Sequence, residues 1–438
     1  LIKPEPKKRQ VLSLLTNKVP FDEIQIDSQV MDLHCSCNFE INGELLPLRL
    51  SRLSIYYAID VATDCILSYK ICFTQHPNQQ DVTDLIIGII KPWKPMHLKI
   101  PGLKYSPEAC LPSNLGVEFR AIAINMIRMD NALCHMAHSI RDLICHKLNA
   151  TLNFGLPKRP KGRNYIEHAI AIISKDLHRF ESTTGSNPNS HIKEKGGSNK
   201  KIPVITLDAL EEVLSVLITD HNIKSQAKLN RSSPLQVLKQ YVSQNYMNLN
   251  PTQIHIANSL HLKQKVVPVK WIKSENRRPH INFENLRYTG NCLSAKELQN
   301  KEVIVEYDES DIRTLKVLSL DGKPIGTVVA PRTWQSKRHS VRTRSRIFKI
   351  VKHERSLSAD PLSGYFNYIY EKRHLPKYAT ELARIFREFS SQTFHTEDIS
   401  SASNDDTSSD STQLGSKRRK HKIPTWTPEI ELLPVRRG

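Results

Sequence analysis

The first clear pattern in the chain is an alternation of apolar and polar residues over 21–34. Ile24, Ile26 and Val30 share one face of an extended chain, and Asp27 stands on the opposite, polar face. Side chains of a β-strand point alternately to its two faces, so this pattern is typical of a strand with one buried face. The segment therefore predicts a strand that presents an acid on its polar side.

Later apolar runs extend this strand into a layered α/β domain. Runs rich in β-branched and aromatic residues predict strands, and apolar residues at helical spacing predict helices. The expected order is three strands, helix, strand, helix, strand and helix, which favours a mixed sheet with helices packed on it. The later elements are expected as a hairpin within 50–73, a helix at 81–90, a strand at 116–129, a helix at 136–148, a strand at 150–154 and a helix that contains Glu167.

The second half of the chain has a different pattern. Helices are expected after Thr206, which can cap a first turn, and from Pro234, which suits the first position of a helix. From Val266 onward, five short β-rich runs are separated by turn residues, among them the hairpin signal Asp321-Gly322. This spacing predicts a small all-β barrel.

The charge of the chain indicates what it binds. Lys and Arg number 63 against 44 Asp and Glu, which gives a formal net charge of +19. Such an excess favours a polyanionic partner, and nucleic acid is preferred to an acidic membrane. Basic residues gather in short segments, whereas acidic residues gather at 398–410. No apolar run is long enough to span a bilayer, so no membrane partner is expected.

Three acids stand at positions suited to metal-ion chemistry. Asp27 lies on the first strand, Asp130 follows an apolar run, and Glu167 lies in the first turns of a helix. Each has an ordinary explanation: a solvated strand acid, a turn-forming Asp-Asn pair, and an acid that complements the helix dipole. Together, beside a basic loop at 158–163, they suggest metal-assisted chemistry on phosphate esters.

The motifs around these acids resemble a known family. I-D-S at Asp27, M-D-N at Asp130 and Y-I-E-H at Glu167 resemble the D-D-E triad of RNase H-like transposases and retroviral-type integrases. The loop P-K-R-P-K-G-R and the barrel segments I-N-F-E-N-L-R-Y and Y-D-E-S-D-I-R resemble Mu/TnsB-type transposases in particular. The resemblance covers about residues 20–340 and implies an RNase H-like mixed-sheet catalytic domain followed by a Mu-type barrel.

The resemblance also implies a reaction. A DNA transposase of this type cleaves the 3′ strand at transposon ends and joins the 3′-OH to target DNA. Asp27 would bridge two Mg²⁺ ions, for which Mn²⁺ can substitute, and Asp130 and Glu167 would each bind one ion. Basic residues are expected to contact DNA phosphates. These residues are Lys158, Arg159, Lys161, Arg163, Lys175, Arg179, Arg338, Arg342, Arg344 and Arg346.

The end of the chain has the composition of a docking peptide. Residues 390–416 are poor in apolar residues, which predicts disorder, and the tail after them carries Trp426, Ile430, Leu432 and Leu433. By resemblance, this tail engages a AAA+ ATPase that regulates transposition. The family also implies a DNA-bound oligomer, a separate nuclease for the second strand, and a cytoplasmic, nucleoid-associated location in bacteria.

Two alternatives stay open beside the transposase. One is a related RNase H-fold integrase or nuclease, and the other is a catalytically idle DNA-binding protein of transposon assembly. In either case the patterns divide the chain into seven expected parts. They are a linker from an upstream region (1–20), the catalytic domain (21–190), a flexible segment and helical connector (191–255), the barrel (256–335), a basic helical region (336–389), a disordered linker (390–416) and the docking tail (417–438).

Overall fold

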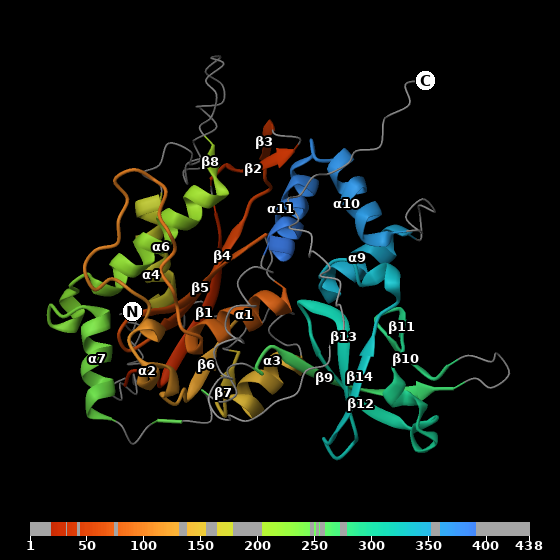
Figure 1. The fold of residues 1–438 in the computed structure, drawn as a ribbon. Helices are drawn as coiled ribbons and strands as arrows, with labels where there is room; N and C mark the ends of the chain where they lie inside the picture. The colour runs from red at the N-terminus through yellow and green to blue at the C-terminus, as the bar shows by residue number, and fades with distance from the viewer. Residues whose placement is uncertain are drawn as a thin grey trace, which may run out of the picture.

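The fold was analysed in a computed structural model of the 438-residue chain (Figure 1). The residues that it describes fall into separate ranges. These ranges are 19–31, 33–41, 44–73, 78–130, 138–154, 164–177, 204–245, 249–250, 254, 259–271, 278–351 and 360–390.

A five-stranded mixed sheet forms the centre of the first half, in the order β5-β4-β1-β6-β7. β5, β4 and β1 are antiparallel neighbours, whereas β6 and β7 run parallel to β1. This architecture confirms the mixed α/β, RNase H-like fold class expected from the sequence. The strands are β1 (Glu23–Val30), β4 (Ser54–Asp60), β5 (Ile66–Cys72), β6 (Met126–Arg128) and β7 (Thr151–Asn153).

Helices cover both faces of this sheet because both faces are apolar. Ile24 and Ile26 of β1 pack with the buried residues of α1, α2, α3 and α7, whereas Tyr57 of β4 packs with those of α4 and α6. The helices are α1 (Gln79–Ile90), α2 (Val117–Ala121), α3 (His138–Arg141) with a π-helical turn (Asp142–Lys147), α4 (Asn164–Leu177), α6 (Leu207–Ile223) and α7 (Pro234–Gln244). As predicted, Thr206 caps α6 and Pro234 begins α7.

Two expectations for the first half were wrong or incomplete. The strand predicted at 116–129 is the short helix α2 followed by β6 alone, because Phe119 and Ala121 bury themselves from a helix after Gly116. A hairpin of β2 (Cys35–Ile41) and β3 (Glu44–Arg49) was not predicted. It forms a second, three-stranded sheet with β8 (Ile205–Thr206), in the order β3-β2-β8.

The predicted β-barrel is present, with six strands instead of five. The sheet order is β11-β10-β9-β12-β13-β14, and an antiparallel bridge between Thr289 and Val329 joins its two ends through hydrogen bonds of 3.1 and 2.9 Å. The extra strand arises because Glu284 and Asn285 adopt positive φ angles and turn the chain. The strands are β9 (Leu262–Lys270), β10 (His280–Phe283), β11 (Leu286–Tyr288), β12 (Glu302–Asp308), β13 (Asp311–Leu318) and β14 (Pro324–Val329).

Three helices follow the barrel, in the part of the chain that was expected to be a basic helical region. They are α9 (Val341–Val351), α10 (Pro361–Glu371) and α11 (Pro376–Ser390), and they lie between the barrel and the β2–β3 hairpin (Figure 1). Short 3-10 helices occur at Pro112–Asn114, Ala227–Leu229, Asn291–Ser294, Lys296–Leu298 and Arg332–Trp334. None of the helices in the described ranges is both long and apolar enough to cross a membrane.

Candidate active site and basic cleft

The parallel pairing of β1 with β6 sets the two aspartates at the same level. The paired positions run as far as Gln25 and Arg128. Asp27 and Asp130 are separated in the sequence by the same interval as these pairs, so continuing the register by two residues places them opposite each other. Residues paired in this way point to the same face of a sheet. Continued past the end of β6, this register would set the two acids, far apart in the sequence, side by side on the inner strands of the sheet.

The environment of Asp27 is partly enclosed. Its side chain is half-buried, and its Oδ1 accepts a hydrogen bond of 2.8 Å from the backbone N–H of Ser28. Asp27 pairs across the sheet with Tyr57, which is fully buried in the same cluster as Ile166 and Ile170 of α4. Asp27 thus belongs to the face of the sheet that α4 covers, and charge interactions there are stronger than in bulk water.

Helix α4 is fixed to this face by a hydrogen bond. The Ser174 hydroxyl donates to Oε1 of Gln29 at 2.5 Å, and Gln29 lies two residues beyond Asp27 on β1. Glu167 precedes Ser174 by about two helical turns and therefore lies on the same side of α4. Its side chain is exposed. The helix that carries the third predicted acid is thus packed on the face that carries the first.

The three carboxylates suit a hard divalent cation by their chemistry, because Mg²⁺ and Mn²⁺ prefer oxygen ligands. Among the residues that the structure describes, however, no group of three or more His, Cys, Asp and Glu side chains is arranged to hold a metal ion. The fold therefore places Asp27 and Asp130 at one level and Glu167 on the helix over them. It does not gather the three side chains into a finished metal site.

Two buried acids near the sheet, Asp60 and Asp64, serve the fold. Asp60 is fully buried and accepts hydrogen bonds from the Phe21 N–H (2.7 Å), the Thr63 N–H (2.9 Å) and the Thr63 hydroxyl (2.7 Å). Burial raises the pKa of Asp60 to about 6. Asp64, in the same turn, forms an ion pair with Lys228. Both acids hold the β4–β5 turn in shape.

Many of the predicted DNA and partner contacts lie outside the described residues. Lys175 is described, and it is exposed on α4, two turns after Glu167. The residues outside the described ranges are Lys158, Arg159, Lys161, Arg163, Arg179, Trp426, Ile430, Leu432 and Leu433.

The prediction that Arg344 contacts DNA was wrong. Its side chain is fully buried and donates hydrogen bonds to the Ile312 carbonyl (3.1 Å), to Nε2 of His339 (3.2 Å) and to the Tyr288 hydroxyl. A phosphate outside the protein cannot reach this guanidinium. Arg344 instead joins α9 to the barrel.

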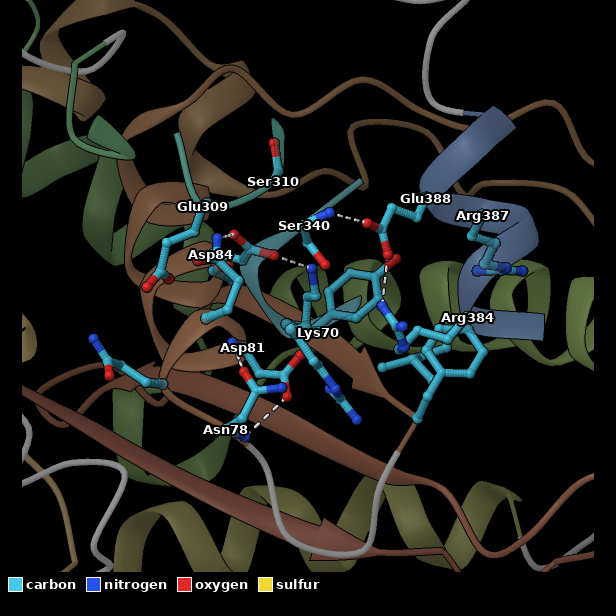
Figure 2. Close-up of a pocket in the computed structure, with 18 of the residues that line it drawn as sticks. Lys70, Asn78, Asp81, Asp84, Glu309, Ser310, Ser340, Arg384, Arg387 and Glu388 are labelled. Atoms are coloured by element: carbon cyan, nitrogen blue, oxygen red, sulfur yellow. Dashed lines mark hydrogen bonds and ion pairs between the residues drawn. The ribbon is translucent and has the colours of Figure 1, made fainter. Parts of the chain in front are cut away.

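The other three arginines of this group line a cleft of about 1210 Å³ (Figure 2). Arg338 donates a hydrogen bond of 3.4 Å to the Ser310 carbonyl, Arg346 forms an ion pair with Glu381, and Arg342 is half-buried. The remaining walls come from β5, α1 and the segment after α1, the β12–β13 turn and α11. This cleft was not predicted from the sequence, although the basic and aromatic run Lys91-Pro92-Trp93-Lys94 was a usable signal.

Comparison with known proteins bears on the barrel. Residues 276–327, which span β10 to β13 and the start of β14, match the family model described as "Mu transposase, C-terminal". The barrel is similar to the C-terminal domain of Mu transposase. This match confirms the Mu-type resemblance that the barrel segments indicated. No curated protein matches the sequence.

Solved structures of integrases also resemble the chain, at low similarity. The catalytic core domain of BIV integrase is 15% identical, with 51% of this chain and 97% of that chain covered and a TM-score of 0.27. A simian T-cell lymphotropic virus intasome, in complex with PP2A regulatory subunit B56 gamma, is 12% identical, with 50% and 55% covered and a TM-score of 0.28. TM-scores this low establish no shared activity.

Proposed function

We propose that this protein is a DNA transposase, a polynucleotidyl transferase of the D-D-E type. The observation that carries the proposal is the Mu-type barrel at 276–327; the mixed sheet before it, whose β1–β6 register would bring Asp27 level with Asp130 if continued by two residues, supports it. The net charge of +19 supports a nucleic-acid substrate. Transposon ends and target DNA are the substrates in this proposal.

The proposed reaction consists of two in-line displacements at phosphorus. Water attacks the scissile phosphate at the transposon end and releases a 3′-OH. That 3′-OH then attacks a target phosphate, so that one P–O bond forms and the P–O bond to the target 3′ oxygen breaks. Asp27, Asp130 and Glu167 would hold two Mg²⁺ or Mn²⁺ ions, which stabilise charge on the attacking and leaving oxygens. No covalent bond to the protein is needed.

Positioning of DNA is assigned to basic residues around α4. Lys175 is exposed on that helix, and the run 158–163 directly precedes it in the sequence. Such residues contact the phosphate backbone and do not read sequence. Self-assembly on DNA, a nucleoid location in bacteria, a separate second-strand nuclease and a AAA+ ATPase partner that docks on the tail belong to the same proposal.

Strand transfer onto target DNA tests this function. A pre-cleaved, labelled DNA end is incubated with Mg²⁺ or Mn²⁺ and with wild type, Glu167→Gln or the control Glu371→Gln, in which an exposed acid of α10 loses its charge. Joined product is expected with wild type and with the control, and at least about a thousandfold less with Glu167→Gln, because loss of one metal ligand removes most of the charge stabilisation.

The outcomes separate the alternatives. Hydrolysis of end DNA without joining would favour a nuclease of the same fold. DNA binding without either reaction would favour a catalytically idle assembly protein. Equal joining by wild type and Glu167→Gln would remove Glu167 from the mechanism.

A further inference from the structure

The cleft beside β5 is separate from the candidate active site. β5 is the edge strand of the five-stranded sheet, and β4 lies between it and β1. The cleft wall from α1 belongs to the face opposite the one that α4 covers. Figure 2 shows Lys70, Asp81 and Asp84 on one side of the cleft and Arg384 and Glu388 of α11 on the other, with Ser340 between them. A group bound here does not face Asp27.

The five acidic residues of the cleft wall are already engaged. Four of them form ion pairs, and Asp81 accepts the backbone hydrogen bond that caps α1 and also interacts with the positive charges of Lys70 and Arg342. The engaged pairs are Asp81 with the Asn78 N–H (2.9 Å), Asp84 with Lys70, Glu211 with Arg387 (2.8 Å), Glu309 with Lys263 (2.7 Å) and Glu388 with Arg384 (2.6 Å).

Three cations of the same wall are not engaged in this way. Lys91, Lys94 and Arg342 make no side-chain hydrogen bond or ion pair with any residue in the described ranges. Burial lowers the pKa of Arg342, and the positive charge of Arg384 lowers it further. Burial, together with the charge of Arg342, lowers the pKa of Arg346 to about 10. Asp81 and Glu388 raise the pKa of Arg342 and so offset part of this repulsion, but Arg342, Arg346 and Arg384 still place like charges close together, which favours a further anion.

The size of the cleft limits the anion. The cleft is a local recess of about 1210 Å³, whereas a DNA duplex is wider than its major groove, which alone spans about 12 Å. A single strand fits such a space. Trp93 stands between Lys91 and Lys94 in the sequence and lines the same wall, and its ring packs edge-on against Tyr105 at 5.8 Å. Aromatic side chains among cations are a common means of holding unpaired nucleotides.

We propose that this cleft is a second nucleic-acid site, which binds an unpaired strand through contacts of its phosphates with Arg342, Lys91 and Lys94. Trp93 provides the surface for a base. The site holds a strand beside the sheet edge, apart from the phosphate at which Asp27 and Asp130 would act. It does not depend on the strand-transfer reaction, so Glu167→Gln is expected to leave this binding unchanged.

Binding of a short oligothymidylate of about 12 nucleotides tests the site. Fluorescence anisotropy of the labelled strand is measured with the full chain, in EDTA and over a salt series. The variant Arg342→Gln/Lys91→Gln/Lys94→Gln is expected to bind more weakly, with a slope of log affinity against log salt that is shallower by about 2, since each lost phosphate contact removes about 0.7 from the slope. Arg342→Lys keeps the charge and is expected to retain the wild-type slope.

The matched control removes three charges outside the cleft. Lys296, Lys301 and Lys349 are exposed and do not line it. The variant Lys296→Gln/Lys301→Gln/Lys349→Gln is expected to keep most of the wild-type slope of log affinity against log salt. If the two triple variants show equal slopes, the site is overturned. Lys91→Gln/Lys94→Gln alone, at exposed positions, gives the same test where Arg342→Gln harms folding.

Two further arms identify the ligand. The triple cleft variant should bind the single strand much more weakly than wild type does, whereas its affinity for a blunt duplex of the same length should fall much less. An equal loss for both ligands would overturn the assignment to an unpaired strand. Free thymidine monophosphate or inorganic phosphate is then added as a competitor, at a concentration matched to the phosphate groups of the strand. If either displaces the strand, the cleft is a mononucleotide or phosphate site instead. Trp93→Leu should weaken strand binding without changing the salt slope, and unchanged affinity would remove the base contact.

Discussion

The guanidinium of Arg344 lies fully buried between the barrel and α9, and no described carboxylate lies within ion-pair distance of it. It sits 5.4 Å from the ring centroids of both Tyr288 and Trp334, and its N–H groups reach the Ile312 carbonyl and His339. Burial lowers the pKa of His339 to about 4, so its ring is neutral near pH 7 and Nε2 can accept the hydrogen bond. Neutral acceptors and aromatic faces thus replace an anion.

Replacement of Arg344 is expected to destabilise the junction of the barrel with α9. Arg344→Gln removes one of the two donors to the Ile312 carbonyl, leaves only the Tyr288 hydroxyl there, and opens space between two rings, so we expect a loss of about 2–4 kcal/mol. Thermal unfolding of the full chain measures the effect, with Arg332→Gln, an exposed arginine of the same region, as the control. Equal melting temperatures for the two variants would contradict this role.

Residue chemistry explains why Arg344 was misjudged from the sequence. Arg342, Arg344 and Arg346 occupy alternate positions of one basic run, Arg338 lies four residues before them, and nothing in composition separates the buried Arg344 from the others. Contacts with the barrel bury Arg344. Its partners Tyr288 and Ile312 come from strands more than thirty residues earlier in the chain, so they meet Arg344 only in the folded molecule. A basic run predicts that most of its residues lie on the surface, but it does not predict the exposure of any single residue.

At the scale of elements, strong periodicity was the reliable signal. The strands β1, β4 and β5, the helices α1, α4, α6 and α7 and the strands of the barrel follow their sequence patterns. The segment 116–129 failed because its apolar residues are shared between a helix and a very short strand, and neither has enough length to set a period. The register that aligns Asp27 with Asp130 depends on pairing between distant segments, which local patterns do not encode.

Helix α1 lies close to β5 at one glycine, and this contact gives a test of the packing. A Cβ added at Gly88 would lie 2.3 Å from the hydroxyl oxygen of Ser68, which is closer than such atoms approach in proteins, whereas the Ser68 Cβ would lie 3.4 Å away. The helix position itself favours alanine over glycine by about 1 kcal/mol. The hydroxyl therefore decides the sign of the substitution.

Gly88→Ala alone is expected to destabilise the protein by about 1–3 kcal/mol, because the helix or the serine must shift. Gly88→Ala/Ser68→Ala should recover this loss, since the clashing oxygen is gone and the helix gains a better residue. Ser68→Ala by itself provides the control for the missing hydroxyl. Chemical denaturation of the four proteins measures the coupling, and additive effects of the two substitutions would show that the contact is absent.

At the scale of the molecule, the last described helix closes back on the first domain. Phe386 of α11 packs on Phe39 of β2 at 4.8 Å between ring centroids, the Thr380 hydroxyl accepts a hydrogen bond of 2.7 Å from the Ser51 N–H, and Arg387 pairs with Glu211 of α6. These contacts join segments more than 170 residues apart. A division of the chain by sequence order alone does not anticipate that residues from both ends build one cleft.

The predicted docking tail at 417–438 lies outside the described residues, the last of which belong to α11. If the tail recruits a AAA+ ATPase, deletion of 417–438 should abolish co-purification with the cognate ATPase. Joining of a pre-cleaved DNA end should stay within about twofold of wild type, since no described residue is removed. A full-length Trp426→Ala/Leu432→Ala/Leu433→Ala variant controls for chain length and should show the same separation. Loss of joining together with recruitment would show that the tail serves the catalytic assembly itself, and retained recruitment would place the ATPase contact elsewhere on the molecule.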